Sequence, residues 1–137
     1  MLAIFASNCP EILVTDFGAY ANRAVPVSIY STSSPEQVSY IVRDAGARII
    51  FVGEQRHYDA ARSIAAECPT LERIVCFDPE VSIDADDATT MRWADFIALG
   101  EAASQMCREA VAVGRTWRNE CCTSRGSRLM ATRMPMN

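Results

Sequence analysis

Short apolar runs alternate with longer amphipathic segments, and this alternation constrains the fold of the chain more than any other feature. Strand-forming runs bounded by turn-forming residues span residues 2–6, 24–30, 48–53 and 73–78. The segments between them are long enough for helices, so consecutive strands run in the same direction through right-handed crossovers. The sequence therefore predicts an α/β fold: an open, doubly wound parallel sheet of about four strands with intervening helices on both faces.

The first connecting segment, residues 9–23, has the features of an amphipathic helix that begins near Pro10. Glu11 and Asp16 are expected on its solvated side. Its apolar residues at helical spacing, expected to face the core, are Leu13, Phe17 and Tyr20.

Two later helices are expected on the same grounds. Residues 54–68 form the third helix, with Tyr58, Ala61 and Ala65 toward the core. Residues 78–90 form an acidic loop, and residues 91–110 form a last helix. The expected core positions of that helix are Trp93, Phe96, Ile97 and Leu99.

A run of serine and threonine, residues 31–34, separates the second strand from the second helix. Ser34, Pro35 and Gln37 fit the N-cap, first and third positions of a capping box, and Gly46 fits the end of the helix. The run contains no glycine, and the chain contains neither G-x-x-x-x-G-K nor G-x-G-x-x-G. The sequence therefore predicts a hinge here rather than a phosphate-binding loop.

All thirteen basic residues are arginine, which excludes chemistry that needs a lysine amine. Residues 1–110 hold sixteen acidic residues against eight arginines, whereas residues 111–137 hold five arginines against one acid and have no hydrophobic period. We expect a partial subdomain over residues 1–110 and a disordered or out-of-frame tail over residues 111–137. Because the body is acidic, no nucleic-acid partner is expected.

Neither the cysteines nor the apolar runs indicate a metal site or a membrane segment. The cysteines form no C-x-x-C pair, and no apolar stretch approaches the roughly 18 residues of a membrane span. Buried or incidental thiols and a soluble, cytoplasmic protein are expected. The cysteines are Cys9, Cys68, Cys76, Cys107, Cys121 and Cys122.

The sequence predicts no catalytic residue and no metal ligand, and it leaves the cofactor-binding residues undefined. His57, the one histidine, is expected at the surface because no nucleophile is marked near it. Asp84, Asp86 and Asp87 lack the glycine and closing glutamate of an EF-hand loop, so a solvated acidic turn is expected.

Four stretches carry a family resemblance. They are the N-x-P-E turn at Asn8, Pro10 and Glu11, and the stretches "AVPVSIY", "TSSPEQVSYI" and "ARIIFVGEQ". Together they resemble the N-terminal part of the AMP-forming acyl-CoA synthetases of the adenylate-forming superfamily, particularly long-chain fatty-acid–CoA ligases. The resemblance covers roughly residues 2–110.

The resemblance implies fatty acid, ATP, magnesium and coenzyme A as partners of an intact enzyme, which forms an acyl-adenylate and then acyl-CoA. The family's phosphate-holding loop would follow residue 110, where the basic tail begins, and its catalytic lysine has no counterpart here. A truncated ligase fragment, inactive alone and without a cofactor of its own, is therefore expected. The alternative is a stand-alone nucleotide- or acyl-binding module using the crevice near Ser7, Asn8 and residues 31–33.

Overall fold

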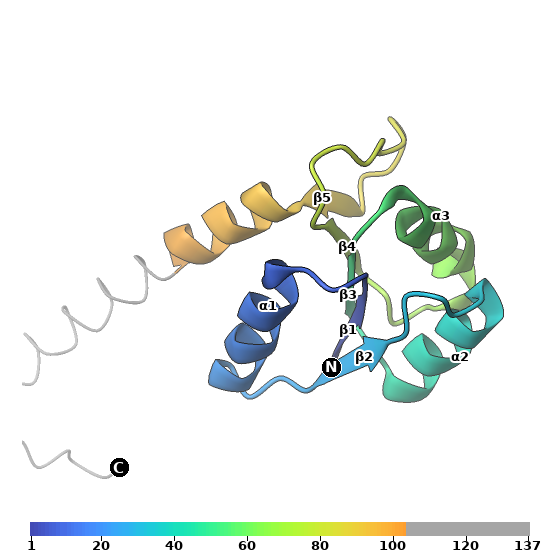
Figure 1. Cartoon of the computed structure of the whole chain (residues 1–137), viewed down its shortest axis with the longest axis horizontal. Coiled ribbons are helices and arrows are strands. Elements are labelled where there is room, and N and C mark those ends of the chain that lie inside the picture. The colour runs from blue at the N-terminus through green and yellow to red at the C-terminus, as the bar shows by residue number, and fades with distance from the viewer. Residues whose placement is uncertain (104–137) are drawn as a thin grey trace, which may run out of the picture. The chain divides into compact units, whose positions relative to one another are not determined.

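Five parallel strands form the sheet in the computed structural model, which describes residues 1–103 (Figure 1). The strands are β1 (Leu2–Phe5), β2 (Pro26–Ile29), β3 (Ile49–Val52), β4 (Arg73–Cys76) and β5 (Thr90–Arg92), in the spatial order β2-β1-β3-β4-β5. The helices are α1 (Pro10–Ala21), α2 (Pro35–Ala45) and α3 (Gln55–Ile64), and the short 3-10 helix η1 spans Ala65–Glu67. The predicted parallel α/β fold is confirmed.

The chain divides into two units, Met1–Ile97 and Ala98–Asn137. Residues 93–97 of the first unit are helical, as are the described residues 98–103 of the second. The tail expected over residues 111–137 lies outside the described residues. In residues 1–103, the helices are too short or too polar to cross a membrane.

The fifth strand corrects the sequence prediction of about four strands. Residues 90–92 were assigned to the end of a loop and the start of a helix, but they pair in parallel with β4, where Ile74 lies opposite Thr90. The helix therefore begins at residue 93. Three residues are too few to show a period in the sequence, and the exposed edge of β4 supplies the hydrogen-bonding partner that makes them a strand.

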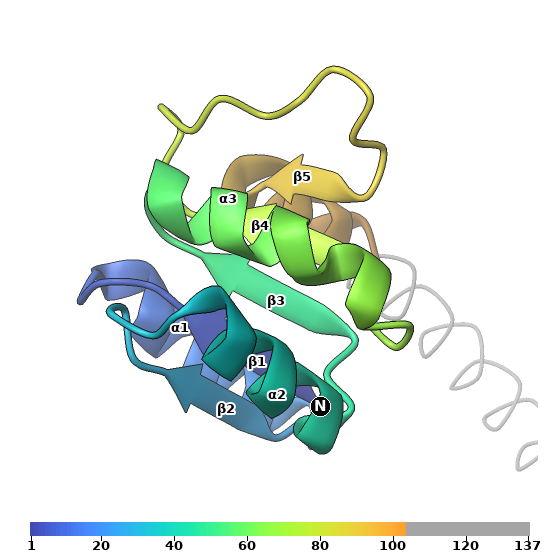
Figure 2. The same ribbon diagram turned by 90° about the vertical axis from the view of Figure 1, so that its right-hand side faces the viewer.

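The strands bury both faces of the sheet, as expected for a parallel sheet. Helices α2 and α3 cover one face and α1 lies on the other (Figures 1 and 2). The core under α2 and α3 includes Ala3, Phe5, Ile50, Val52, Ile74 and Cys76. The core on the opposite face consists of Ile4, Phe51, Val75 and Phe77, with Ile12, Trp93 and Phe96 packed against it. Alternate residues of each strand thus enter different cores.

Helix α2 confirms the interpretation of the serine-rich run. The Gln37 amide donates to the Ser34 hydroxyl at 3.5 Å, and the Ser34 amide donates to the Gln37 side chain at 3.0 Å. Pro35 occupies the first helical position, and Gly46 ends the helix in the left-handed conformation with φ of 59°. Pro26 is likewise the first residue of the edge strand β2, where no central ladder needs its missing N–H.

Helix α1 forms where expected, but the predicted core face was wrong. Leu13, Phe17 and Tyr20 are 61%, 72% and 64% exposed, whereas Thr15 and Ala19 are buried. The helix is apolar on most of its circumference, so the spacing of its large side chains did not reveal which side meets the sheet.

Replacing Ser34 with Ala removes the hydroxyl of the capping box and should destabilise the chain by about 1 kcal/mol. Urea unfolding followed by circular dichroism measures this difference. Thr32→Ala is the matched control, because Thr32 is exposed and its hydroxyl makes no hydrogen bond to the residues described. Equal midpoints for Ser34→Ala and the wild type would contradict a stabilising cap.

Candidate functional site

The carboxyl ends of β1, β2 and β3 are the natural place for a ligand in this fold. The chain leaves β1 toward α1 on one face and leaves β3 toward α3 on the other, which makes a topological switch point between two adjacent strands (Figure 2). The predicted candidates, Ser7 with Asn8 and residues 31–33, lie in the loops that follow β1 and β2. Residues 54–57 join them from β3, although no sequence motif marks these residues for a site.

His57 was expected at the surface, but its side chain is fully buried. Its Nδ1 accepts a hydrogen bond from the Glu54 amide at 3.1 Å, and its Nε2 lies 3.0 Å from the Ser31 carbonyl oxygen. Because Nδ1 accepts, the proton must be on Nε2, which donates to that carbonyl. The Phe5 ring packs edge-on against the imidazole at 4.5 Å between centroids. One neutral histidine therefore joins the ends of three strands.

The surroundings of His57 favour its neutral form. Burial lowers the pKa of His57 from 6.5, and the charge of Arg56 acts in the same direction. The Ser31 carbonyl and the Glu54 carboxylate oppose this shift without reversing it. A signal for burial was present in the sequence, since His57 shares a helical stripe with the buried Ala61 and Ile64.

The ends of β1 and β3 lie in close contact at the switch point. A Cβ atom on Gly53 would lie 3.0 Å from the Cβ of Ala6, so the two strand ends touch. Above this contact, Arg56 donates to the Ser7 hydroxyl at 3.2 Å and pairs with the Glu54 carboxylate at 3.0 Å. The Ser7 hydroxyl, together with Arg56, lowers the pKa of Glu54. These contacts join the loop after β1 to the loop after β3.

The described residues at this edge do not fit magnesium and a triphosphate. The loops at residues 7–8 and 31–33 have no glycine that would let their amides approach a phosphate. Arg56, the cation at the switch point, is already paired with Glu54. Within residues 1–103, no group of three or more His, Cys, Asp or Glu side chains is placed to hold a metal ion.

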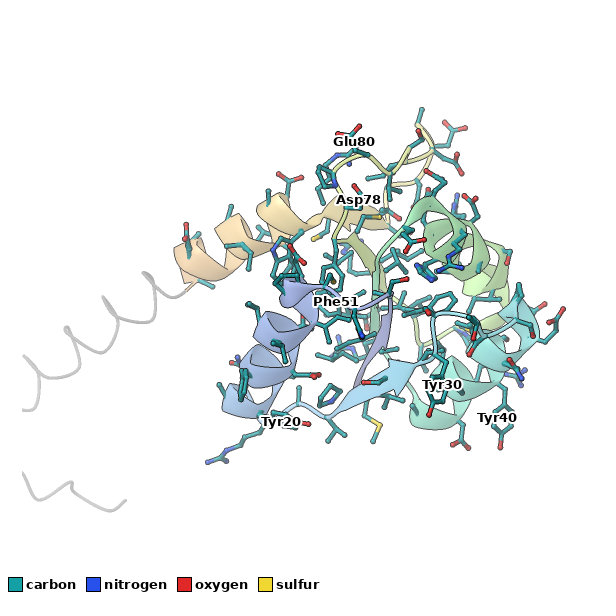
Figure 3. The ribbon with its side chains drawn as sticks, viewed as in Figure 1. Tyr20, Tyr30, Tyr40, Phe51, Asp78 and Glu80 are labelled. Carbon is teal, nitrogen blue, oxygen red and sulfur yellow. The ribbon has the colours of Figure 1, made fainter. Side chains whose placement is uncertain are left out.

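A hollow of about 530 Å³ lies beside this edge, between the end of β2 and helix α2. Its lining includes Tyr30, Thr32, Ser33, Glu36, Gln37 and Tyr40. Figure 3 shows Tyr30 and Tyr40 on this side of the molecule, and both rings are largely exposed. The Ser34 hydroxyl donates to the Glu36 carboxylate and lowers its pKa, which keeps a negative charge in the hollow. Aromatic and hydroxyl surfaces suit a polar aromatic group, whereas this carboxylate repels a phosphate.

The acidic loop before β5 is organised around a buried carboxylate. Asp87 was expected in a solvated turn, yet it is only 8% exposed. It accepts hydrogen bonds from the Tyr58 hydroxyl at 3.1 Å and from the Thr89 amide and hydroxyl at 3.0 and 2.6 Å, and also from the Thr90 hydroxyl. Arg62 lies 3.5 Å away. Asp87 thus attaches the loop to α3 and β5, which is a structural role.

These contacts explain the acidity of Asp87. Burial by itself raises the pKa of this carboxyl group, but the hydrogen bonds from Thr89, Thr90 and Tyr58 outweigh burial and lower it from 3.8 to about 2. The expectation of a solvated side chain was therefore correct for its exposed neighbour Asp86 and wrong for Asp87.

One acidic side chain of α1 is less exposed than expected. Asp16 was expected in solvent, but its Oδ1 is buried and has no hydrogen-bond partner among the described residues.

Cys68 and Cys76 are buried free thiols and Cys9 is half-buried, in agreement with structural or incidental roles. Burial raises the pKa of Cys76 to about 11, so this thiol is a poor nucleophile. The remaining cysteines lie outside the described residues.

The chain matches one protein family and is similar to several known proteins. The family described as AMP-binding enzyme matches residues 1–113. The chain is 29% identical over 126 residues to long-chain-fatty-acid–CoA ligase ACSBG2 of Gallus gallus, and 27% identical over 121 residues to long-chain-fatty-acid–CoA ligase ACSBG1 of Homo sapiens. These alignments cover 89% and 88% of this chain and 16% of each relative. The chain thus spans about one sixth of the length of these relatives.

Solved structures share the sheet. Coronafacic acid ligase from Pectobacterium brasiliense aligns with a TM-score of 0.62 at 20% identity, over 71% of this chain and 19% of that one. The anthranilate CoA ligase AuaEII, solved with anthranoyl-AMP, aligns with a TM-score of 0.54 at 28% identity, over 59% of this chain and 16% of that one. The first likeness establishes a common fold.

The buried site of His57 can be tested directly, because the chain contains one histidine. A ¹⁵N spectrum of the imidazole should show the Nε2–H tautomer and a pKa below 6.5. Since folding favours the neutral ring, the stability contributed by its depressed pKa is complete above pH 6.5 and is lost as the pH falls through the folded pKa. His57→Phe should lack this part of the pH dependence. An Nδ1–H tautomer, or a pKa of 6.5 or higher, would contradict the assignment.

Asp87→Ala should destabilise the chain by about 3 kcal/mol, because it leaves the buried Tyr58 hydroxyl without this acceptor and removes the hydrogen bonds that Asp87 accepts from Thr89. Asp86→Ala is the control, since Asp86 is exposed and its side chain makes no hydrogen bond to the described residues. The stabilisation from the depressed pKa of Asp87 is present above pH 3.8 and is lost as the pH falls toward 2. Similar urea midpoints for the two variants would show that Asp87 does not hold the loop.

Proposed function

The chain belongs to the AMP-binding enzyme family, and from this premise we propose that it is a piece of a long-chain-fatty-acid–CoA ligase without catalytic activity of its own. The observation that carries the proposal is the family match, which runs through the whole described sheet. The curated relatives named above are long-chain-fatty-acid–CoA ligases, which supports a fatty acid as the substrate of the parent enzyme.

The reaction proposed for the parent enzyme places strict demands on a site. The fatty-acid carboxylate attacks the α-phosphorus of ATP and pyrophosphate leaves; the thiol of coenzyme A then attacks the acyl-adenylate and AMP leaves. The triphosphate must be held in line with the carboxylate while positive charge and amide donors neutralise it. Such a cradle would need groups that the described residues do not bring together.

Three features of the chain support the absence of catalysis. It contains no lysine, so arginine is the side-chain cation available at neutral pH. The arginine at the switch point, Arg56, is neutralised by Glu54. The Ser7 hydroxyl beside it accepts a hydrogen bond from Arg56. In this proposal the described residues supply part of the sheet on which a ligase site is built.

A stand-alone binding module is the second candidate function. The hollow beside α2 favours it, because exposed aromatic rings and hydroxyl groups meet there. Its carboxylate, Glu36, makes it better suited to the adenine ring or another neutral aromatic group than to phosphate. This module was expected to bind near Ser7, Asn8 and residues 31–33, and Thr32 and Ser33 line the hollow.

The purified chain should release no pyrophosphate above a heat-killed control when ATP, magnesium, a fatty acid and coenzyme A are supplied. Calorimetric titration with ATP and with an acyl-adenylate should likewise give no saturable binding. Fatty-acid-dependent turnover that survives repurification from host ligases would overturn the proposal. Binding without turnover, abolished by Tyr30→Ala with Tyr20→Ala as control, would instead favour the binding module.

A further inference from the structure

The two hydrogen bonds of the His57 ring depend differently on its charge. The side chain is fully buried. Its Nδ1 accepts from the Glu54 amide at 3.1 Å, and its Nε2 donates to the Ser31 carbonyl at 3.0 Å. A protonated imidazole carries a hydrogen on both nitrogens, so Nδ1 can then no longer accept. A second proton on the ring is therefore compatible with one of these bonds and not with the other.

The incompatible bond is the one to the Glu54 amide. A hydrogen on Nδ1 would face the Glu54 N–H, and both groups would be donors. The Ser31 carbonyl accepts from Nε2–H in either charge state, and a charged donor strengthens that bond. The ring also has little space in which to turn, because a Cβ atom on Gly53 would lie 3.4 Å from Nδ1. Protonation thus separates the ring from the Glu54 amide and keeps it on the loop after β2.

The bond that breaks positions the start of α3. Glu54 is the N-cap residue of this helix, and its carbonyl accepts from the His57 amide at 2.9 Å and from the Tyr58 amide at 3.2 Å. The bond to Nδ1 holds the amide of the same N-cap residue. In the first turn of the helix, Arg56 donates to the Ser7 hydroxyl at 3.2 Å. Loss of the Nδ1 bond therefore loosens the first turn of α3 and its connection to the loop after β1.

The charged groups that act on the ring lie on the same segment. The Glu54 carboxylate favours protonation and the Arg56 guanidinium opposes it, and these two groups pair with each other at 3.0 Å. Strand β1 contributes the Phe5 ring and the loop after β2 contributes the Ser31 carbonyl, and neither is charged. Burial has the largest effect and lowers the pKa of His57 from 6.5, so the neutral ring, and with it the closed start of α3, predominates at neutral pH.

We propose that His57 is a pH-sensitive switch: a second proton, taken up from solvent at Nδ1, releases the Glu54 amide and opens the first turn of α3, while the bond to Ser31 and the sheet persist. Loss of this proton closes the turn again, so the opening is reversible. It detaches residues 54–57 from the loop after β1, at the edge where β1 and β3 meet. The switch uses contacts within the described residues alone and does not depend on the proposed function.

Amide hydrogen exchange of the full chain, followed by NMR as a function of pH, tests this switch. After correction for the intrinsic pH dependence of exchange, the protection of the Glu54 amide should fall by about tenfold per pH unit below the folded pKa of His57, because one proton is linked to opening. The Ile74 amide, which donates to the Thr89 carbonyl at 3.2 Å within the sheet, is the internal reference and should keep its protection over the same range.

His57→Asn is the matched variant, because the amide oxygen of asparagine can accept from the Glu54 amide in place of Nδ1 and does not take up a proton in this range. Its Glu54 amide should stay protected through the pH range in which the wild-type histidine titrates. A loss of protection that persists in His57→Asn would assign the opening to a carboxylate and overturn the proposal. In the wild type, Glu54 protection that stays constant while the ¹⁵N signals of His57 titrate would overturn it, and so would a loss that occurs together with that of Ile74.

Discussion

The burial of both faces of a parallel sheet is the constraint on which the rest of this structure depends. Alternate residues of each strand enter two separate cores, so each face must be covered by side chains from outside the sheet. Helices α2 and α3 cover one face with a core of fully buried residues. The other face holds fewer buried residues and is completed by α1 and by the aromatic side chains of Trp93 and Phe96. The stacking of Phe51 on Phe77, with centroids 5.6 Å apart, anchors this second core.

Many α/β proteins bind a ligand at the carboxyl ends of their strands, but in this chain the side chains at that edge mainly bind one another. A ligand-binding edge keeps polar groups free and backbone amides accessible. Here Ser7, Glu54 and Arg56 satisfy one another, and His57 uses both ring nitrogens to hold the Glu54 amide and the Ser31 carbonyl. These bonds stiffen three loops at once. Because these side chains are hydrogen-bonded within the protein, their donor groups are not available to a phosphate.

Local sequence patterns predict most of the fold but little of the candidate functional site. The order of strands and helices, the capping box at Ser34 and the left-handed Gly46 follow from local patterns, because each depends on residues near one another in the chain. The burial of His57 and Asp87 depends on partners 26 to 29 residues away, and both residues look like surface residues to a local reading. The family resemblance was also readable from the sequence, since it lies in contiguous stretches, and the match over residues 1–113 confirms it.

The fold class and the caps of α2 follow from the order of amino acids in the chain. Hydrophobic period, proline and glycine placement and residue identity are properties of the chain alone. Contacts between distant parts of the chain select which side of α1 meets the sheet, pair Thr90–Arg92 with β4 as a fifth strand, and bind Arg56 to Ser7 at the strand ends. The physical reason is the same in each case. A helix that is apolar on most sides, a three-residue segment and a polar loop each have several acceptable environments. Long-range packing of the strands against these segments selects one.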